Sequence, residues 1–277
     1  MFKTLLVPTD FSPQAMHALE VAAQLAKRYD AKIYLLHLLE MPELYIDGPG
    51  PQQASELPEA LYFMQLAHKR FADILDMPLL KGIEVIEAAE FNGAFEGIME
   101  YVNKYKIDAI VMGSHGTSGL QELFIGSNAE KVVRHSRIPV LIIKDKTPDF
   151  NIKKFIFATD LQEDNIVPVQ KALRLAEQES AQLQLVYINT PNRFKTSFEL
   201  LENYRGFVEY LDTDIKQFDI YNDHSIERGI LNFAEQSKAD LIGIGTHGRK
   251  GLAHFFNGSV SLDLVNHALR PVITFNI

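Results

Sequence analysis

The sequence predicts an α/β protein built from two tandem doubly wound (Rossmann-like) domains, each a five-stranded parallel sheet flanked by helices. Two observations lead to this prediction. Short apolar segments alternate with longer amphipathic ones five times in each half, a pattern that favours parallel strands joined by helices. The second half also repeats the first, because residues 155–160 match residues 5–10 at an offset of 150 residues. We therefore expect one domain over residues 1–146 and another over residues 151–277.

Composition narrows the class of protein. Of the 277 residues 47% are hydrophobic and 23% are charged, as in ordinary soluble proteins. No apolar run approaches the ~20 residues of a membrane span, and the first residues turn polar too soon for a signal peptide. Without cysteine there are no disulfides, and with a net charge of −9 and no dense basic tract we expect no nucleic-acid partner. These features predict a cytoplasmic protein that binds neither membrane nor nucleic acid.

The first half can be divided into elements by its apolar periodicity. Strands are expected at residues 5–7, 33–39, 82–91, 107–112 and 138–143, and helices at residues 12–29, 61–75, 93–105 and 128–137. Ser12 and Pro13 form an N-cap and N1 pair for the first helix. Residues 41–58 contain four prolines and two glycines, so we expect a loop there. Residues 144–154 are expected to link the two halves.

The second half follows the same order with two departures. Its first two strands repeat at an offset of 150 and its glycine-rich segment at an offset of 132, so 18 residues are missing between the second and third strands. Ala158 stands where the first half has Pro8, and Pro168 stands where it has Ala18. Because proline fits only the first turn of a helix, the first helix of this half is expected to start late.

Each half carries a glycine-rich segment between an apolar strand and a helix. The sequence Gly113-Ser114-His115-Gly116 is followed by nine residues and then Gly126-Ser127, and Gly245-Thr246-His247-Gly248 is followed by nine residues and Gly258-Ser259. Glycines let the backbone approach an anion, and a helix N-terminus offers free N–H groups. In a doubly wound sheet the ligand lies where the strand order reverses. We therefore expect Asp10 to meet Gly113, and Asp160 to meet Gly245.

These segments resemble the nucleotide-binding signature of universal stress proteins, and the resemblance covers almost the whole chain. It implies a tandem member of that family, with sheet order 3-2-1-4-5 in each domain, that binds ATP with Mg²⁺ or Mn²⁺ in stress response or signalling. Asp10 and Asp160 would serve the ribose or a phosphate-bound metal, and the Leu38 and Ile188 backbones would meet adenine. The nucleotide-binding residues implied for the first half are Pro8, Thr9, Asp10, Leu38, Met112, Gly113, His115, Gly116, Gly126, Ser127 and Asn128. Those implied for the second half are Thr159, Asp160, Ile188, Ile244, Gly245, His247, Gly248, Arg249, Gly258, Ser259 and Val260.

Other interpretations of these residues stay open. The chain is also compatible with a metal-dependent ATPase or phosphotransferase, or with a protein-interaction module whose pockets are degenerate. The two histidines His115 and His247 suit hydrogen bonding within their loops as well as contact with phosphate. Residues 243–248 formally match a dinucleotide fingerprint, but no helix follows the last glycine directly, so this match is weak.

The final strands of the halves suggest how the halves associate. Residues 140–143 and 272–275 are apolar edge strands, which proteins usually cover or pair. The resemblance implies that they pair, so we expect a pseudo-dimer within one chain; a homodimer of the whole chain stays open. Arg249-Lys250 replaces Thr117-Ser118 in the second loop. Cations beside phosphates predict tighter binding at the second crevice.

Overall fold

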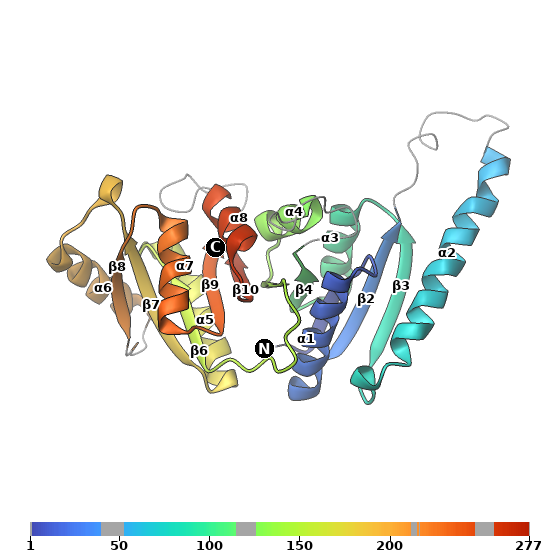
Figure 1. The fold of residues 1–277 in the computed structure, drawn as a ribbon, viewed down its shortest axis with the longest axis horizontal. Coiled ribbons are helices and arrows are strands. Elements are labelled where there is room, and N and C mark those ends of the chain that lie inside the picture. The colour runs from blue at the N-terminus through green and yellow to red at the C-terminus, as the bar shows by residue number, and fades with distance from the viewer. Residues whose placement is uncertain are drawn as a thin grey trace.

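The computed structural model describes residues 2–39, 53–114, 126–211, 215, 217–246 and 258–276, and only the backbone of residues 53–59 and 258–261. Two α/β halves lie next to each other (Figure 1). The first half contains β1 (Thr4–Pro8), α1 (Pro13–Tyr29), β2 (Lys32–Leu39), α2 (Gln53–Leu75), the 3₁₀ turn η2 (Pro78–Leu80), β3 (Val85–Phe91), α3 (Ala94–Lys104), β4 (Ala109–Gly113), α4 (Ser127–His135) and β5 (Val140–Ile143).

The second half repeats this order with two extra 3₁₀ turns. It contains β6 (Lys154–Ala158), η3 (Glu163–Asn165), α5 (Ile166–Glu179), β7 (Gln182–Asn189), η4 (Pro191–Arg193), α6 (Ser197–Leu211), β8 (Phe218–Asn222), α7 (Ile226–Ser237), β9 (Leu241–Thr246), α8 (Gly258–His267) and β10 (Val272–Asn276).

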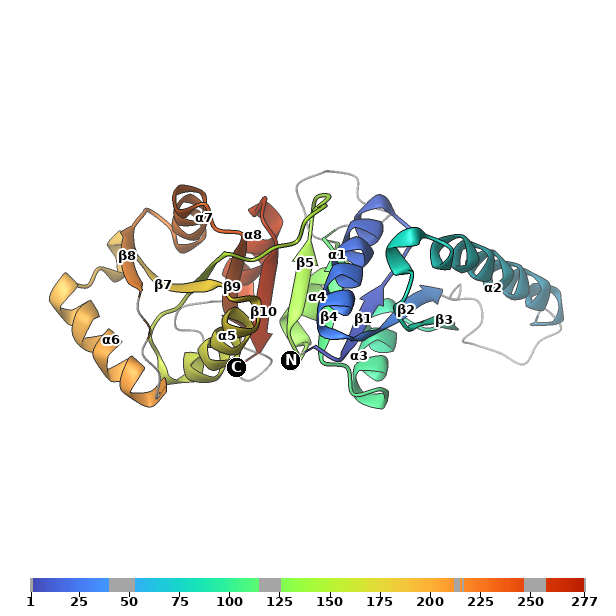
Figure 2. The same ribbon diagram turned by 90° about the horizontal axis from the view of Figure 1, so that it is seen from below.

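All ten strands belong to one sheet with the order β3-β2-β1-β4-β5-β10-β9-β6-β7-β8. Each half therefore has the expected parallel order 3-2-1-4-5. The expectation of two separate sheets is wrong, because β5 and β10 pair antiparallel through Ile142↔Val272 and Val140↔Thr274 and fuse the halves. This pairing confirms that the last strands meet within one chain, and Figure 2 shows them side by side at the centre of the molecule.

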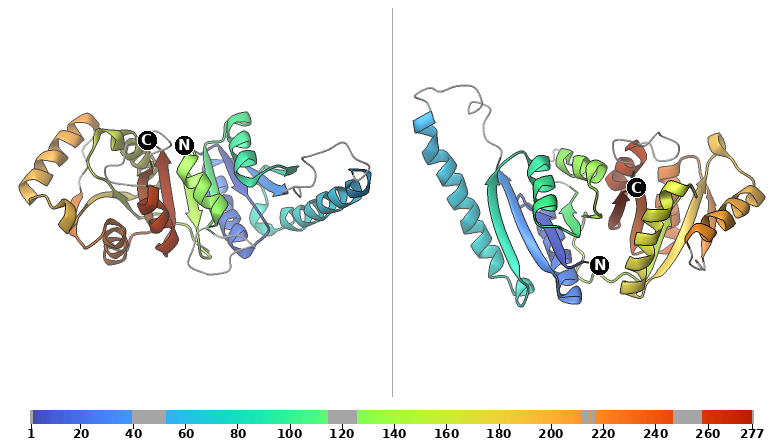
Figure 3. Two further views of the ribbon diagram at one scale, coloured as in Figure 1. Left: turned by 90° about the horizontal axis from the view of Figure 1, so that it is seen from above. Right: turned by 180° about the vertical axis from the view of Figure 1, so that it is seen from behind.

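The helices cover both faces of the sheet. One core lies beneath α1, α2, α5 and α6, and a second lies beneath α3, α4, α7 and α8. The outermost helices, α2 and α6, stand at opposite ends of the molecule (Figure 3). Residues on alternate positions of each strand thus enter different cores, as period-2 alternation requires.

An equivalent aspartate in each half accepts the same pair of backbone hydrogen bonds. Asp108 Oδ2 accepts from the backbone N–H groups of Lys3 and Thr4, at 2.8 and 2.9 Å. Asp240 Oδ2 accepts from those of Lys153 and Lys154, at 2.9 and 2.8 Å. The offsets of 150 and 132 residues read from the sequence therefore match equivalent positions in space.

Polar contacts also join the halves. Arg28 forms an ion pair with Glu179, whose side chain is 2% exposed, and the Tyr29 hydroxyl donates to the same carboxylate. Burial, followed by the hydrogen bond to Glu179, raises the pKa of Tyr29. Lys144 Nζ donates to the Asn266 carbonyl, and burial lowers its pKa to about 8.

Two expectations about helix ends have different outcomes. The loop expected over residues 41–58 is too long, because α2 begins at Gln53. Three of the four prolines and both glycines that predicted the loop precede Gln53, and the helix continues through Pro58. The late start of the first helix in the second half is confirmed. The helix α5 begins at Ile166 after the 3₁₀ turn η3, whereas α1 begins at Pro13, equivalent to residue 163.

Candidate functional site

A cavity of about 370 Å³ opens at the carboxyl ends of β1, β2 and β4 in the first half. Nine of the residues expected there line it: Pro8, Thr9, Asp10, Leu38, Met112, Gly113, Gly126, Ser127 and Asn128. The other two, His115 and Gly116, lie outside the described residues. Strand ends and a helix N-terminus that are far apart in the sequence thus converge on one space.

The turn after β1 holds the Asp10 carboxylate at the cavity. Thr9 Oγ1 accepts from the Phe11 N–H at 3.0 Å, and Asp10 Oδ1 accepts from the Ser12 N–H at 3.0 Å. Phe11 adopts the left-handed region, with φ of 64°, and Ser12 Oγ then caps α1 through the Ala15 N–H at 3.2 Å. Asp10 is partly exposed, so it both stabilises the turn and faces the cavity.

The end of β2 offers backbone groups to the same space. The Thr9 N–H donates to the Leu36 carbonyl at 2.8 Å, which is the last bond of the β1–β2 ladder. In a parallel ladder the next bond would run from the Leu38 N–H to the Thr9 carbonyl. Instead, His37 Nδ1 lies 2.8 Å from that carbonyl. The Leu38 backbone therefore faces the cavity beyond the end of β1, where a ligand edge can hydrogen-bond to it.

Close packing at β4 requires Gly113. A Cβ atom on this residue would lie 2.8 Å from the backbone C and O atoms of Gln14. The first turn of α1 can therefore sit directly over the end of β4 only if residue 113 is glycine. This contact places Ala15 in the cavity wall, which also contains Met112.

The N-terminus of α4 forms the remaining wall. The Gly126 N–H donates to the Ser114 carbonyl at 2.7 Å, and the Ser114 N–H donates to the Ile143 carbonyl at 3.1 Å. Gly126 is the N-cap, and no described side chain caps this helix end. The first N–H groups of α4, beginning at Ser127, are therefore directed toward the cavity, which suits an anion.

Seven further residues line the cavity that the sequence did not single out: Ala15, Leu36, His37, Ala94, Ile98, Ser114 and Ala129. A glycine repeated in both halves could have indicated that the start of α3, and with it Ala94, lies at the cavity. Gly97 and Gly229 are equivalent glycines inside helices, and a Cβ atom on either would lie within 2.5 Å of the side chain of Leu38 or Ile188. These repeated glycines mark where α3 and α7 press against the end of the second strand.

His37 is held in a neutral, oriented state. Burial lowers its pKa, although the hydrogen bond to the Thr9 carbonyl partly opposes that effect. Its ring packs against Phe11 with centroids 4.5 Å apart. Because a carbonyl only accepts, Nδ1 carries the proton in this contact. Asp10 and His37 are the titratable side chains among the described cavity residues.

The second half has the same turn after its first strand, but there the aspartate side chain is buried. Thr159 Oγ1 accepts from the Leu161 N–H at 3.0 Å, and Asp160 Oδ1 accepts from the Gln162 N–H at 3.1 Å. Asp160 Oδ1 also accepts from Asn165 Nδ2 at 2.8 Å, and Asp160 is only 3% exposed. Asn165 occupies the position of Ala15, so a polar side chain holds the carboxylate that the first half leaves at its cavity.

The other expected residues of the second half are only partly described. Ile188, Ile244 and Gly245 end β7 and β9, while Gly258, Ser259 and Val260 begin the backbone of α8. His247, Gly248 and Arg249 lie outside the described residues. Ile226, partly buried in the second core, stands where the first half has Ala94. The second half therefore has a larger side chain at that position.

Gly243 has a packing role. A Cβ atom there would lie 2.7 Å from the ring of Phe155 and 2.8 Å from that of Phe157. Its counterpart Val111 packs where smaller side chains, Leu5 and Val7, replace the two rings. The weak match of residues 243–248 to a dinucleotide fingerprint thus has an explanation in the core.

The described residues contain no group of three or more His, Cys, Asp or Glu side chains that could hold a metal ion by themselves. Within the same part of the chain, no helix has the length and apolar character needed to cross a membrane.

The fold defines the class of doubly wound α/β proteins, and the cavity lies at the topological switch point of its first half. The model of the universal stress protein family matches residues 1–144 and again residues 151–276, so the chain belongs to that family and carries two of its domains.

Individual relatives agree with this assignment. The chain is similar to universal stress protein YxiE of Bacillus subtilis, with 31% identity over 160 residues that cover 52% of this chain and 100% of that protein. It is 23% identical to universal stress protein Slr1230 of Synechocystis, with 99% of each chain covered. A crystal structure of a universal stress protein from Archaeoglobus fulgidus has the same fold, with a TM-score of 0.66, 20% identity, and coverage of 99% of this chain and 98% of that one.

Proposed function

We propose that the protein is a cytoplasmic nucleotide-binding module of stress response or signalling that takes ATP, or a related adenine nucleotide, in the crevice of its first half. The observation that carries the proposal is the 370 Å³ cavity, where the Asp10 turn, the Leu38 backbone and the uncapped start of α4 converge. Phosphates would lie at α4, because helix N-termini stabilise anions. Adenine would meet the Leu38 backbone between Ala94 and Ile98.

A divalent cation would accompany the nucleotide. Mg²⁺ and Mn²⁺ prefer oxygen ligands and usually bind through one or two carboxylates together with substrate phosphates. Asp10, partly exposed at the cavity, fits this indirect role. Asp160 fits it less well, because it is buried and its Oδ1 already accepts from Asn165.

We propose that the second crevice binds nucleotide more weakly than the first. The sequence-based prediction of tighter binding there rests on Arg249 and Lys250, which lie outside the described residues. The described residues favour the first half, because Asn165 replaces Ala15 and binds the Asp160 carboxylate, and the larger Ile226 replaces Ala94. Charge-assisted hydrogen bonds from an Arg or Lys contribute roughly 1.5–3 kcal/mol each, but only after the ligand can enter.

We favour nucleotide binding without hydrolysis. Asp10 and His37 are the titratable groups of the described lining, and the Nδ1–H of His37 is already donated to the Thr9 carbonyl. Slow metal-dependent ATP hydrolysis is the alternative. It predicts phosphate release above background that disappears when Asp10→Ala and Asp160→Ala are combined.

Mass spectrometry of ligand released from freshly purified protein tests the proposal. We expect an adenine nucleotide, and titration of stripped protein with ATP and Mg²⁺ should restore binding. An empty protein that also shows no heat of binding with ATP, ADP or AMP would contradict the proposal and favour a protein-interaction module.

A further inference from the structure

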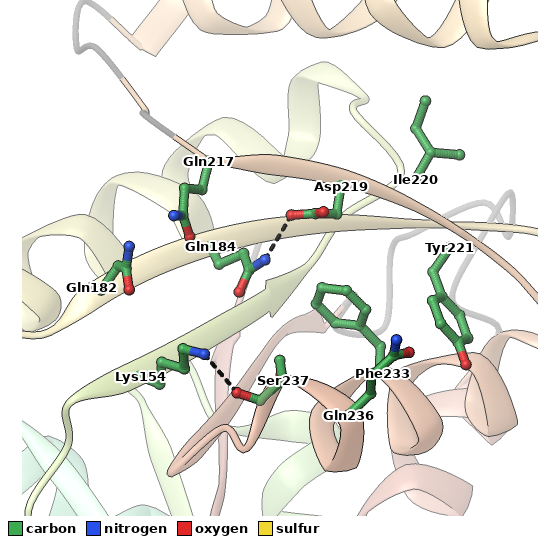
Figure 4. A pocket seen from close by; sticks show the side chains of 10 residues that line it. All are labelled: Lys154, Gln182, Gln184, Gln217, Asp219, Ile220, Tyr221, Phe233, Gln236 and Ser237. Atoms are coloured by element: carbon green, nitrogen blue, oxygen red, sulfur yellow. Dashed lines mark hydrogen bonds between the residues drawn. The ribbon is translucent and has the colours of Figure 1, made fainter.

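The second half contains a cavity that is unrelated to the strand-end crevices. It measures about 420 Å³ and lies at the amino ends of β6, β7 and β8, beneath the last turn of α7 (Figure 4). In parallel strands the amino and carboxyl ends are opposite edges of the sheet. Within the second half this cavity therefore lies at the opposite ends of the strands from the crevice, so a ligand here would occupy a different space from the proposed nucleotide.

In the first half, aromatic rings occupy the equivalent space. Tyr34 stacks on Tyr105 with centroids 4.6 Å apart, and Tyr101 meets both rings at 6.4 and 4.9 Å. At the repeat offsets of 150 and 132 residues, Gln184 replaces Tyr34 and Ser237 replaces Tyr105. The loss of two rings opens the cavity.

The replacement side chains form a polar wall. Gln184 Nε2 donates to Asp219 Oδ2 at 2.6 Å, and Asp219 stands where the strand register of the first half has Ala88 (Figure 4). Three more carboxamides come from β7, from the residue before β8 and from α7: Gln182, Gln217 and Gln236. A carboxamide has two donor hydrogens and one acceptor oxygen, so this wall can both donate and accept.

The charges at the cavity disfavour an anion. Lys154 Nζ donates to the carbonyl of Ser237 at 2.8 Å, so the ammonium already serves the carboxyl end of α7. That end carries the negative pole of the helix, and Asp219 adds a carboxylate. Phe233, only 8% exposed, provides an apolar floor, and Tyr221 packs edge-on against it at 5.5 Å.

From these features we propose a binding site for a small neutral polyhydroxylated ligand, a sugar or a polyol. Hydroxyl groups both donate and accept, which matches carboxamides and a carboxylate, while the C–H face of a sugar ring would pack on Phe233.

The test is an NMR titration of the ¹⁵N-labelled full chain with glucose, maltose and sorbitol. Binding of at least one probe, with a Kd on the order of 1 mM or tighter, should shift the side-chain amide signals of Gln184 and Gln236. Glucose 6-phosphate, a charged analogue, should bind at least about tenfold more weakly than glucose. Absence of shifts with all three neutral probes, or tighter binding of the phosphate, would overturn the proposal.

Variants that copy the first half provide the control. The triple variant Gln184→Tyr, Asp219→Ala and Ser237→Tyr refills the cavity as in the first half, and it should abolish the shifts while leaving the nucleotide affinity unchanged. The milder variant Gln236→Ala, at an exposed position of α7, should weaken probe binding severalfold without affecting folding. Shifts that persist unchanged in either variant would contradict the assignment.

Discussion

The two crevices of this protein share a backbone and differ in their side chains. In both halves a Thr–Asp turn ends the first strand and the next residue adopts a left-handed conformation, Phe11 at 64° and Leu161 at 63°. Yet Asp10 lines an open cavity, whereas Asp160 is buried against Asn165. Repeating a fold thus preserves the frame of a site, while a few side-chain replacements decide whether a ligand can enter it.

The opposite ends of the strands show the reverse difference. There the first half is filled by three tyrosines, and the second half has a cavity lined by carboxamides. The duplication has therefore left an open space at the carboxyl ends of the strands in the first half and at their amino ends in the second half. The side chains of one half therefore define substitutions that test the role of the equivalent positions in the other half.

The largest effect is expected from transferring the lining of the second crevice to the first. The double variant Ala15→Asn and Ala94→Ile should weaken ATP binding about 100-fold, equivalent to about 2.7 kcal/mol. Both new side chains would project into the cavity, and the introduced asparagine would hold the Asp10 carboxylate as Asn165 holds Asp160. Isothermal titration with ATP and Mg²⁺ measures the change.

The reverse pair, Asn165→Ala and Ile226→Ala, is the matched control and should not weaken binding at the first half. Wild-type affinity in the Ala15→Asn, Ala94→Ile variant would show that these positions do not separate the two crevices.

A smaller effect, on stability, is expected in the core. Gly243→Val should lower the free energy of unfolding by about 1–3 kcal/mol, the usual cost of overpacking, because its Cβ would collide with the rings of Phe155 and Phe157. Adding Phe155→Leu and Phe157→Val, which copies the first half, should recover most of this loss. Urea denaturation of both variants provides the comparison, and equal stability of the single and triple variants would refute the compensation.

The smallest expected effect is on the pH dependence of the free energy of unfolding. Burial lowers the pKa of His37 below its usual 6.5, so the unfolded chain takes up a proton before the folded one does. The contribution of His37 to stability is therefore complete above about pH 6.5 and is lost as the pH falls below it, with a slope of at most about 1.4 kcal/mol per pH unit.

His37→Gln keeps a donor for the Thr9 carbonyl but does not titrate. Its free energy of unfolding should fall less steeply than that of the wild type between pH 6.5 and lower values. Parallel curves for the two proteins would mean that His37 protonates equally in both states.

Much of this architecture was predictable because the sequence repeats. Alternating apolar and amphipathic segments predicted parallel strands joined by helices, while the resemblance to universal stress proteins implied the strand order and the pairing of β5 with β10. The resemblance carried by the two glycine-rich segments implied nine of the residues that line the first cavity. What the sequence could not reveal were properties of contacts between distant elements. The single ten-stranded sheet depends on how the halves dock, and the role of Asn165 depends on its distance from Asp160.

Small and unremarkable residues were the hardest to interpret. Ala15 and Ala94 carry no chemistry, and their importance lies in the space that they leave. Gly243 matches part of a cofactor motif in the sequence, whereas its neighbours Phe155 and Phe157 explain it by packing. Polar and charged residues can be selected from the sequence as candidates for a binding site. The space left by small residues can be recognised only once the packing of the helices and strands is known.

Two single variants test whether the first crevice is the stronger nucleotide site. Gly126→Glu places a carboxylate at the start of α4, and Gly258→Glu does the same at α8. Isothermal titration with ATP and Mg²⁺ should show that Gly126→Glu removes the tighter binding event, while Gly258→Glu leaves it intact. Loss of the tighter event in Gly258→Glu, with its retention in Gly126→Glu, would contradict the account.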